Sequence, residues 1–474
     1  MHRTRLAKEC VETELTTIAP IELHLIERTY PDKHPSNFRS LLFMVVAALV
    51  IRLAVMCFVY TDQMSPAYDH FKFGFETGRI ARSIVQGEGF SSPLFTKTGP
   101  TAWMTPVYPL IIAGFFKVFG VYTKSAAFAI LSFNSLTSAL TCIPIFFFAR
   151  RSFGPSVAKW AGWTWAFFPY AIYFPLDRIW ETWLSTLLFS ILFFVALELE
   201  NPEKKDRLAP WIGAGLLWGV AALTSAAVLS VLPFLQARTS YLRYKQGRRW
   251  LMPNLALGLA LAAVVSPWAV RNWRTFHTFT PFRDNMGLVL RMGTQGATDY
   301  WEPSDLGPWM DPTEVAEFHR DGELKYMATK KVQAINFIKT HPRWFAWTSL
   351  RRVVFIWTGY WSLQPWYLQL EPWDPANIGF STAFTILTLL GLRKAWVKHK
   401  DAALPFTIML VVFPLIYYIT SPEFYYRRPL DPMMVVLAVY ALVPSRRDTL
   451  TTRDDESRLR VGTYDSYEPE LAER

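Results

Sequence analysis

Four carboxylates lie beside apolar runs at spacings that suit acid–base chemistry. Asp69 and Glu76 are seven residues apart, so a helix that covered both would place them on one face, two turns apart. Asp177 and Glu181 are four residues apart and would share a helical face. A positioned carboxylate can remove a proton from a hydroxyl group, so these residues are candidates for a catalytic base and for groups that orient a substrate.

Each carboxylate pair also has a structural alternative. Asp69 and Glu76 could form the solvated face of a helix at a membrane surface. Asp177 could be a helix N-terminal acid favoured by the helix dipole. That alternative accounts less well for Glu181, which begins an apolar run between two tryptophans.

Three arginines are candidates for holding a phosphate group. Arg427 and Arg428 follow two tyrosines, and Arg52 lies inside an apolar run. Guanidinium forks match phosphate oxygens. The alternatives are an interfacial position for Arg427 and Arg428, and a buried pair with a carboxylate for Arg52. Acids and arginines on one side of a membrane would suit a lipid-phosphate donor and a hydroxyl acceptor.

The apolar runs that must position these residues predict an all-α polytopic membrane protein. The chain is 51% hydrophobic and 16% aromatic, and many tryptophans stand at the ends of apolar runs. We expect about ten transmembrane helices with both chain ends in the cytoplasm. The predicted spans are residues 41–60, 126–149, 156–173, 183–197, 211–223, 226–242, 251–270, 380–392, 404–419 and 430–442.

The basic residues fit a membrane protein better than a nucleic-acid-binding protein. The net charge is +11, but Lys and Arg cluster in short stretches beside the apolar runs. That arrangement is typical of cytoplasmic loops, and nucleic acid is excluded as a partner. Five basic clusters are assigned to the cytoplasm: residues 150–159, 204–207, 238–249, 393–400 and 446–447.

The span assignment divides the chain into three parts. Residues 1–38 form a cytoplasmic tail without a cleavable signal peptide, residues 39–445 form the transmembrane domain, and residues 446–474 form a disordered cytoplasmic tail. Two short apolar segments, 107–119 and 347–361, are expected to be outer interfacial helices; the alternative is that each dips into the membrane with a partner. The four outer loops are residues 61–125, 174–180, 271–346 and 421–429.

Several stretches of the chain resemble the GT-C glycosyltransferases that use polyprenyl-phosphate sugars. That group includes the protein O-mannosyltransferases, the aminoarabinose transferases and the lipopolysaccharide galacturonosyltransferase-like enzymes. The similar stretches, spread over residues 40–445, are 76–90, 105–120, 147–154, 180–182 and 426–432. The resemblance implies a GT-C-like fold and a multi-pass protein of the bacterial inner membrane with its active site facing the periplasm.

The chain departs from the family pattern at two places. Phe73 stands where the family often has an acid, and Met104 and Thr105 stand where the aminoarabinose branch has a phosphate-binding lysine. The nearest acids to Phe73 are Asp69 and Glu76. Glu76 is therefore favoured as the catalytic base, with Asp69 as the alternative.

The resemblance implies an inverting hexosyl- or pentosyltransferase. A sugar would move from a polyprenyl phosphate to a hydroxyl group of a glycan, lipid or protein. Asp177 or Glu181 would orient the acceptor or the sugar. Arg427 and Arg428, or else Arg52, would hold the phosphate. No cofactor is expected beyond the lipid-linked sugar; a divalent metal held by the carboxylates is the alternative.

Two other functions remain open. A transporter or flippase of lipid-linked sugars would use the same lipid partner. A non-catalytic scaffold for envelope assembly would use loop 271–346 as its interaction segment.

Overall fold

The computed structural model describes residues 36–59, 73–202, 206–294, 307–309, 311–359, 365–370, 372–421 and 425–443. The chain divides into two compact units, residues 1–43 and 44–474, and the second contains nearly all of the described residues. The described residues of this unit are mainly helical. Ser91 and Pro100 form an isolated antiparallel β-bridge. The predicted all-α fold is confirmed.

Six helical segments are long and apolar enough to cross a membrane. They coincide with six of the predicted spans, so the chain is a multi-pass membrane protein. These segments comprise α2 (Ser36–Phe58), α5 and α6 (Lys124–Leu140, Cys142–Phe153), α9 (Thr182–Leu199), α12 (Leu251–Phe276), α18 (Asp374–Lys398), and α19 and α20 (Lys400–Val412, Leu415–Ile419).

The predicted total of about ten spans is not confirmed, because the other four segments form shorter helices. Residues 156–173 break at Phe168, which is extended because Pro169 follows it. α21 has twelve residues, and Asp431 through Tyr440 are buried. The shorter helices are α7 (Pro155–Ala166), α8 (Pro169–Asp177), α10 (Ala209–Thr224), the 3-10 helix η3 (Ala226–Val231), α11 (Leu232–Lys245) and α21 (Asp431–Leu442).

Small residues allow close packing between the helices. A Cβ added to Gly215 of α10 would lie 2.2 Å from the Leu257 carbonyl oxygen of α12, and one added to Gly391 of α18 would lie 1.9 Å from the Leu437 carbonyl oxygen of α21. Side chains cannot fit at these crossings, so glycine is required there.

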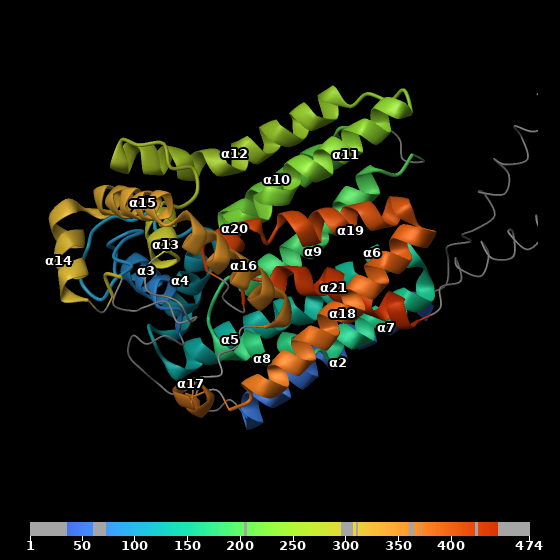
Figure 1. The fold of residues 1–474 in the computed structure, drawn as a ribbon, viewed down its shortest axis with the longest axis horizontal. Coiled ribbons are helices and arrows are strands. Elements are labelled where there is room, and N and C mark those ends of the chain that lie inside the picture. The colour runs from blue at the N-terminus through green and yellow to red at the C-terminus, as the bar shows by residue number, and fades with distance from the viewer. Residues whose placement is uncertain are drawn as a thin grey trace, which may run out of the picture. The chain divides into compact units, whose positions relative to one another are not determined.

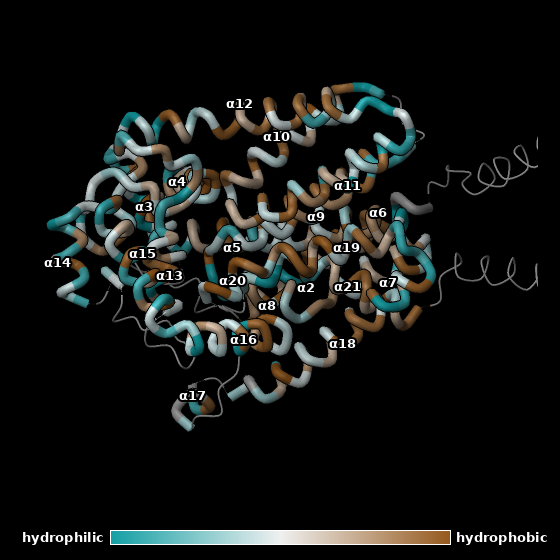
Figure 2. Tube along the Cα trace, turned by 45° about the horizontal axis from the view of Figure 1, so that its top comes forward, coloured by the Kyte–Doolittle hydropathy of each residue, from teal (hydrophilic) through white to brown (hydrophobic). Residues whose placement is uncertain are grey.

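The connections between α6 and α7, α11 and α12, and α18 and α19 lie at one end of the bundle (Figure 1), and they carry basic residues. Arg151 lies 3.5 Å from Glu198, and Arg238 lies 2.9 Å from Glu200. Arg243 and Arg248 both contact Asp206. Four of the five predicted basic clusters have members at this end, whereas residues 446–447 lie outside the described residues. Figure 2 shows hydrophobic residues along the helices between this end and the opposite one.

The opposite end is built from the two long loops. It comprises α3 (Glu76–Val85), α4 (Val107–Phe119), α13 (Met286–Met292), α14 (Pro312–Asp321), α15 (Glu323–Thr340) and α16 (Pro342–Thr358). Leu94 and Trp103 of the first loop share an apolar core with Leu288, Phe318 and Tyr326 of the second. Segments 107–119 and 347–361 are largely helical here, and their position relative to a membrane remains a prediction. The short helix α17 (Pro365–Leu370) follows α16.

The carboxyl group of Glu323 and the backbone amide of Asp284 join these loops. Glu323 accepts hydrogen bonds from the Thr101 hydroxyl (2.5 Å) and the Ala102 amide (2.6 Å), and the Asp284 amide donates to the Ala102 carbonyl (3.1 Å). Burial raises the pKa of Asp284 to about 6. Burial and the charge of Asp284 raise the pKa of Glu323 well above its usual range. The charge of Asp284 therefore disfavours ionisation of Glu323.

We expect the Asp284→Asn variant to be more stable than the wild type at pH 7. A carboxyl group whose folded-state pKa is raised binds its proton more tightly when folded, so wild-type stability should increase as the pH falls from about 6 towards 4. The variant should lose most of that pH dependence. Melting temperatures between pH 4 and 8 test this. The control is Asp311→Asn, which changes an exposed helix cap. If the melting temperature of Asp284→Asn depended on pH as that of the wild type does, the expectation would be contradicted.

Candidate functional site

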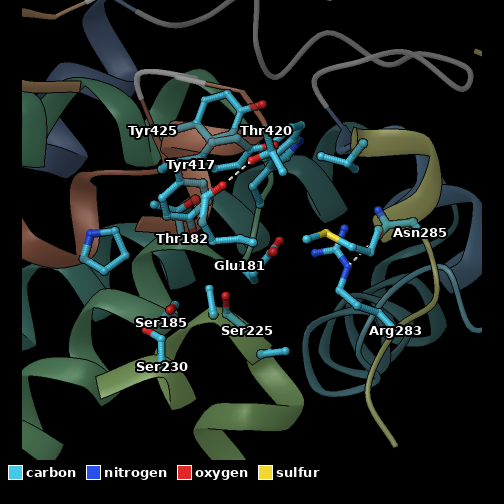
Figure 3. Close-up of a pocket in the computed structure, with 18 residues that line it drawn as sticks. Glu181, Thr182, Ser185, Ser225, Ser230, Arg283, Asn285, Tyr417, Thr420 and Tyr425 are labelled. Atoms are coloured by element: carbon cyan, nitrogen blue, oxygen red, sulfur yellow. Dashed lines mark hydrogen bonds between the residues drawn. The ribbon is translucent and has the colours of Figure 1, made fainter. Parts of the chain in front are cut away.

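A cavity of about 450 Å³ lies where the short loop before α9, helix η3, the start of α13 and the segment around α20 meet (Figure 3). Its volume is in the range of small-molecule sites. Tyr417 and Tyr425 lie on one side, and Ser185, Ser225 and Ser230 lie on another. The ring of Trp180 packs against that of Tyr425, with centroids 4.3 Å apart. The lining residues are Trp180, Glu181, Thr182, Ser185, Ser225, Ala226, Ala227, Ser230, Arg283, Asn285, Met286, Val289, Ile416, Tyr417, Thr420, Tyr425, Tyr426 and Pro429.

Glu181 lies at the centre of this cavity, directly before α9. Its carbonyl accepts from the Ser185 amide at 2.8 Å, which fixes the first turn of α9. Its Oε2 atom is buried and has no hydrogen-bond partner in the protein. Burial raises the pKa of Glu181, and the nearby Arg283 partly offsets this. A buried acceptor without a partner is costly unless a ligand or water satisfies it, so Glu181 is available for substrate.

Glu76, the first residue of α3, is close enough to Glu181 for their charges to interact, but it is not among the residues that line the cavity. Burial raises the pKa of Glu76, Arg79 and Arg283 lower it, and the charge of Glu181 raises it further. The structure therefore brings together the two acids from the first and second outer loops. Their chemical roles remain predictions.

The close approach of the two loops depends on Gly74. Its φ is +79°, and an added Cβ would lie 2.1 Å from the Ile179 carbonyl oxygen. Phe75 also has a positive φ, +42°, so the chain turns sharply before Glu76. Phe73 and Ile179 belong to one apolar cluster that secures the contact.

Arg283 is the cation of the site, and the sequence analysis did not identify it. Its Nε donates to Asn285 Oδ1 at 2.7 Å, and it is close enough to Glu76 and Glu181 to affect the pKa of both. Figure 3 shows it facing Glu181 across the cavity. Among the described residues that line the cavity, Arg283 is the cationic side chain. The sequence offered only one weak signal, a charged residue within a loop rich in Pro and Gly.

Arg427 and Arg428, which the sequence analysis predicted to hold a phosphate, are buried and contact other protein groups. Both are 2% exposed and contact Asp431, at 3.3 and 2.8 Å respectively. Arg427 also donates to the Ile356 carbonyl, and Arg428 stacks on Tyr170 with its guanidinium carbon 3.8 Å from the ring centroid. Their neighbours Tyr425, Tyr426 and Pro429 line the cavity, but the arginines do not. Their predicted role as phosphate ligands remains a prediction.

Arg52 and Asp177 do not line the cavity. Arg52 is fully buried and donates to the Ala171 carbonyl at 2.9 Å and the Ala48 carbonyl at 2.8 Å, so it joins helices rather than binding phosphate or pairing with a carboxylate. Asp177 ends α8 and contacts Arg178 at 3.3 Å. Asp69 lies outside the described residues. Within the part of the chain that is described, no three His, Cys, Asp or Glu side chains form a potential metal site.

Replacing Gly74 by Ala should disrupt the site through a steric clash. The clash with Ile179 adds to left-handed strain of roughly 1–2 kcal/mol. Gly87→Ala is the matched control, because Gly87 has φ +82° and nothing within 4 Å of an added Cβ. We expect Gly74→Ala to lower the melting temperature more than Gly87→Ala and to abolish activity. Equal effects in the two variants would mean that the contact does not organise the site.

Part of the chain matches a known protein family. Residues 103–270, less than half of the chain, match the family of dolichyl-phosphate-mannose-protein mannosyltransferases. No curated protein matches the chain in sequence.

Solved structures are similar to the chain at low identity. The oligosaccharyltransferase of Archaeoglobus fulgidus in its apo form has 11% identity and a TM-score of 0.48, with 91% of this chain and 53% of that chain covered. The same enzyme with an inhibitory peptide and a dolichol-phosphate has 12% identity and a TM-score of 0.44, covering 92% and 52%. ArnT from Cupriavidus metallidurans bound to undecaprenyl phosphate has 13% identity and a TM-score of 0.38, covering 86% and 78%. The chain spans about half the length of the archaeal enzyme, and the family resemblance predicted from the sequence is confirmed for residues 103–270.

Proposed function

We propose that this protein is a membrane glycosyltransferase that moves a sugar from a polyprenyl-phosphate donor to a hydroxyl acceptor. The observation that supports this most directly is that Glu181 and Arg283 line a cavity of about 450 Å³, with Glu76 close enough for both to affect its pKa. The matched mannosyltransferase family, whose name describes a dolichyl-phosphate sugar donor, supports the same class of reaction.

The protein must stabilise the departing phosphate and accept the proton of the acceptor hydroxyl. The acceptor oxygen attacks the anomeric carbon while the bond between that carbon and the phosphate oxygen breaks, which inverts the configuration. Arg283 stabilises the departing phosphate as its charge develops. The acceptor proton passes to a carboxylate, which contributes roughly a hundred- to ten-thousandfold to the rate.

Glu76 and Glu181 supply that carboxylate as a coupled pair. Burial raises the pKa of both acids, and Arg283 opposes that rise in each. Glu181 lines the cavity and orients the acceptor hydroxyl, and Glu76, which is near Glu181 but not among the lining residues, accepts the proton. Asp69 remains the alternative proposal for the base.

Neutralising either acid should stop transfer while donor binding persists. We expect Glu76→Gln and Glu181→Gln each to lower kcat at least about a hundredfold, measured as release of free carrier from purified undecaprenyl-phosphate sugars. Glu88→Gln, in the same loop and paired with Lys97, is the control. A Glu76→Gln variant with wild-type kcat would remove Glu76 from this role.

The Arg283→Met variant should instead weaken donor binding. A guanidinium that meets the donor phosphate contributes about 1.5–3 kcal/mol as a hydrogen-bonded charge. Binding of undecaprenyl phosphate to the purified protein measures this effect directly. The exposed Arg274→Met is the matched control. A wild-type protein that moves the lipid-linked sugar across a bilayer without releasing any sugar would favour a flippase instead.

We also propose that the site faces the periplasm of a bacterial inner membrane. The basic end of the bundle would then lie in the cytoplasm, as the positive-inside rule requires. In a cysteine-free background, a membrane-impermeant maleimide should label Lys97→Cys in intact spheroplasts, and Lys245→Cys only after lysis. The reverse pattern would invert the topology and contradict the proposal.

A further inference from the structure

The serine side of the cavity contains polar atoms that no protein group satisfies. Ser185 is 2% exposed, and its Oγ has no hydrogen-bond partner; the Oγ of Ser230 is likewise buried and unpaired. Both residues line the cavity, and Figure 3 shows them near Ser225, on the side away from the tyrosines. Buried hydroxyls are normally hydrogen-bonded, so an unpaired pair facing a cavity indicates a ligand with hydroxyl groups.

The position of Ser185 follows from the helix that carries Glu181. The two residues are four apart, so Ser185 lies one turn further along the same face of α9. Ser190, on the same helix, donates to the Thr186 carbonyl at 2.8 Å and is satisfied. Ser185 therefore differs from Ser190; the Oγ atoms of Ser132 and Ser135 on α5 are also unpaired, but those residues do not line the cavity.

The charge distribution of the cavity indicates which part of the donor lies there. Arg283 and Glu181 are the Arg and Glu side chains that line it, and they face one another near its centre. A phosphate held by Arg283 places the attached sugar directly beside it. The serine side presents hydroxyls and the methyl groups of Ala226 and Ala227. A carboxylate or ammonium group on the sugar would have no counter-charge on that side, which is unfavourable in a partly enclosed site.

We infer that Ser185 and Ser230 form the sugar subsite and that the transferred sugar is neutral, with free hydroxyls facing α9 and η3. This inference rests on the proposed glycosyl transfer. Each serine hydroxyl can both donate and accept, which matches a sugar hydroxyl. A site built in this way rejects a donor that lacks the matching hydroxyl, because its own polar atom is then left unpaired.

The test compares purified protein on undecaprenyl phosphates that bear glucose, mannose, galactose, galacturonic acid or aminoarabinose. Release of free carrier should be fastest with one of the three neutral sugars. The best neutral donor is then compared with its monodeoxy analogues. At least one analogue should lose about tenfold or more in kcat/KM. In Ser185→Ala or Ser230→Ala, the full sugar and that deoxy analogue should have about the same kcat/KM. The kcat/KM for the full sugar should be lower than in the wild type.

Ser190→Ala is the matched control and should keep the wild-type discrimination. A variant that merely loosens the fold would slow all donors alike and leave the ratio unchanged. A preference for galacturonic acid or aminoarabinose, or unchanged ratios in both serine variants, would overturn the inference and leave the proposed function intact. No carrier release with any donor, after the protein is shown to be folded, would overturn the proposed function itself.

Discussion

The contact between Gly74 and Ile179 is the constraint on which the site depends. It brings a backbone turn of the first long loop against the short loop before α9. Because each loop contributes one buried acid, the contact creates a pair of carboxylates that neither loop could form alone. The apolar cluster around Phe73 and Ile179 stabilises the contact through burial rather than through charge.

Placing two acids together away from water has an electrostatic cost that the site offsets with one cation. Arg283 lies close enough to lower the pKa of both carboxyls, while burial raises both. Perturbed carboxyl groups of this kind beside a cavity are typical of functional sites. In the proposed reaction, Arg283 would also meet the donor phosphate.

The structure uses its other arginines differently. Arg52 joins helices through backbone carbonyls, and Arg427 and Arg428 share Asp431 within the protein core. A guanidinium inside a helical bundle has five donors, so it can join several chain segments at once. An arginine in an apolar run is therefore a weak indicator of a ligand site, because internal partners satisfy it equally well.

The sequence by itself determined the all-α membrane fold, six of the spans, and two acids that lie near one another, of which Glu181 lines the cavity. It could do so because span length, charge clusters and the spacing of Glu181 within its helix are local properties. Arg283, Ser185 and Ser230 became visible only in the tertiary structure. Their significance depends on which segments meet and on which polar atoms remain unpaired, and both follow from long-range packing that spacing along the chain does not encode.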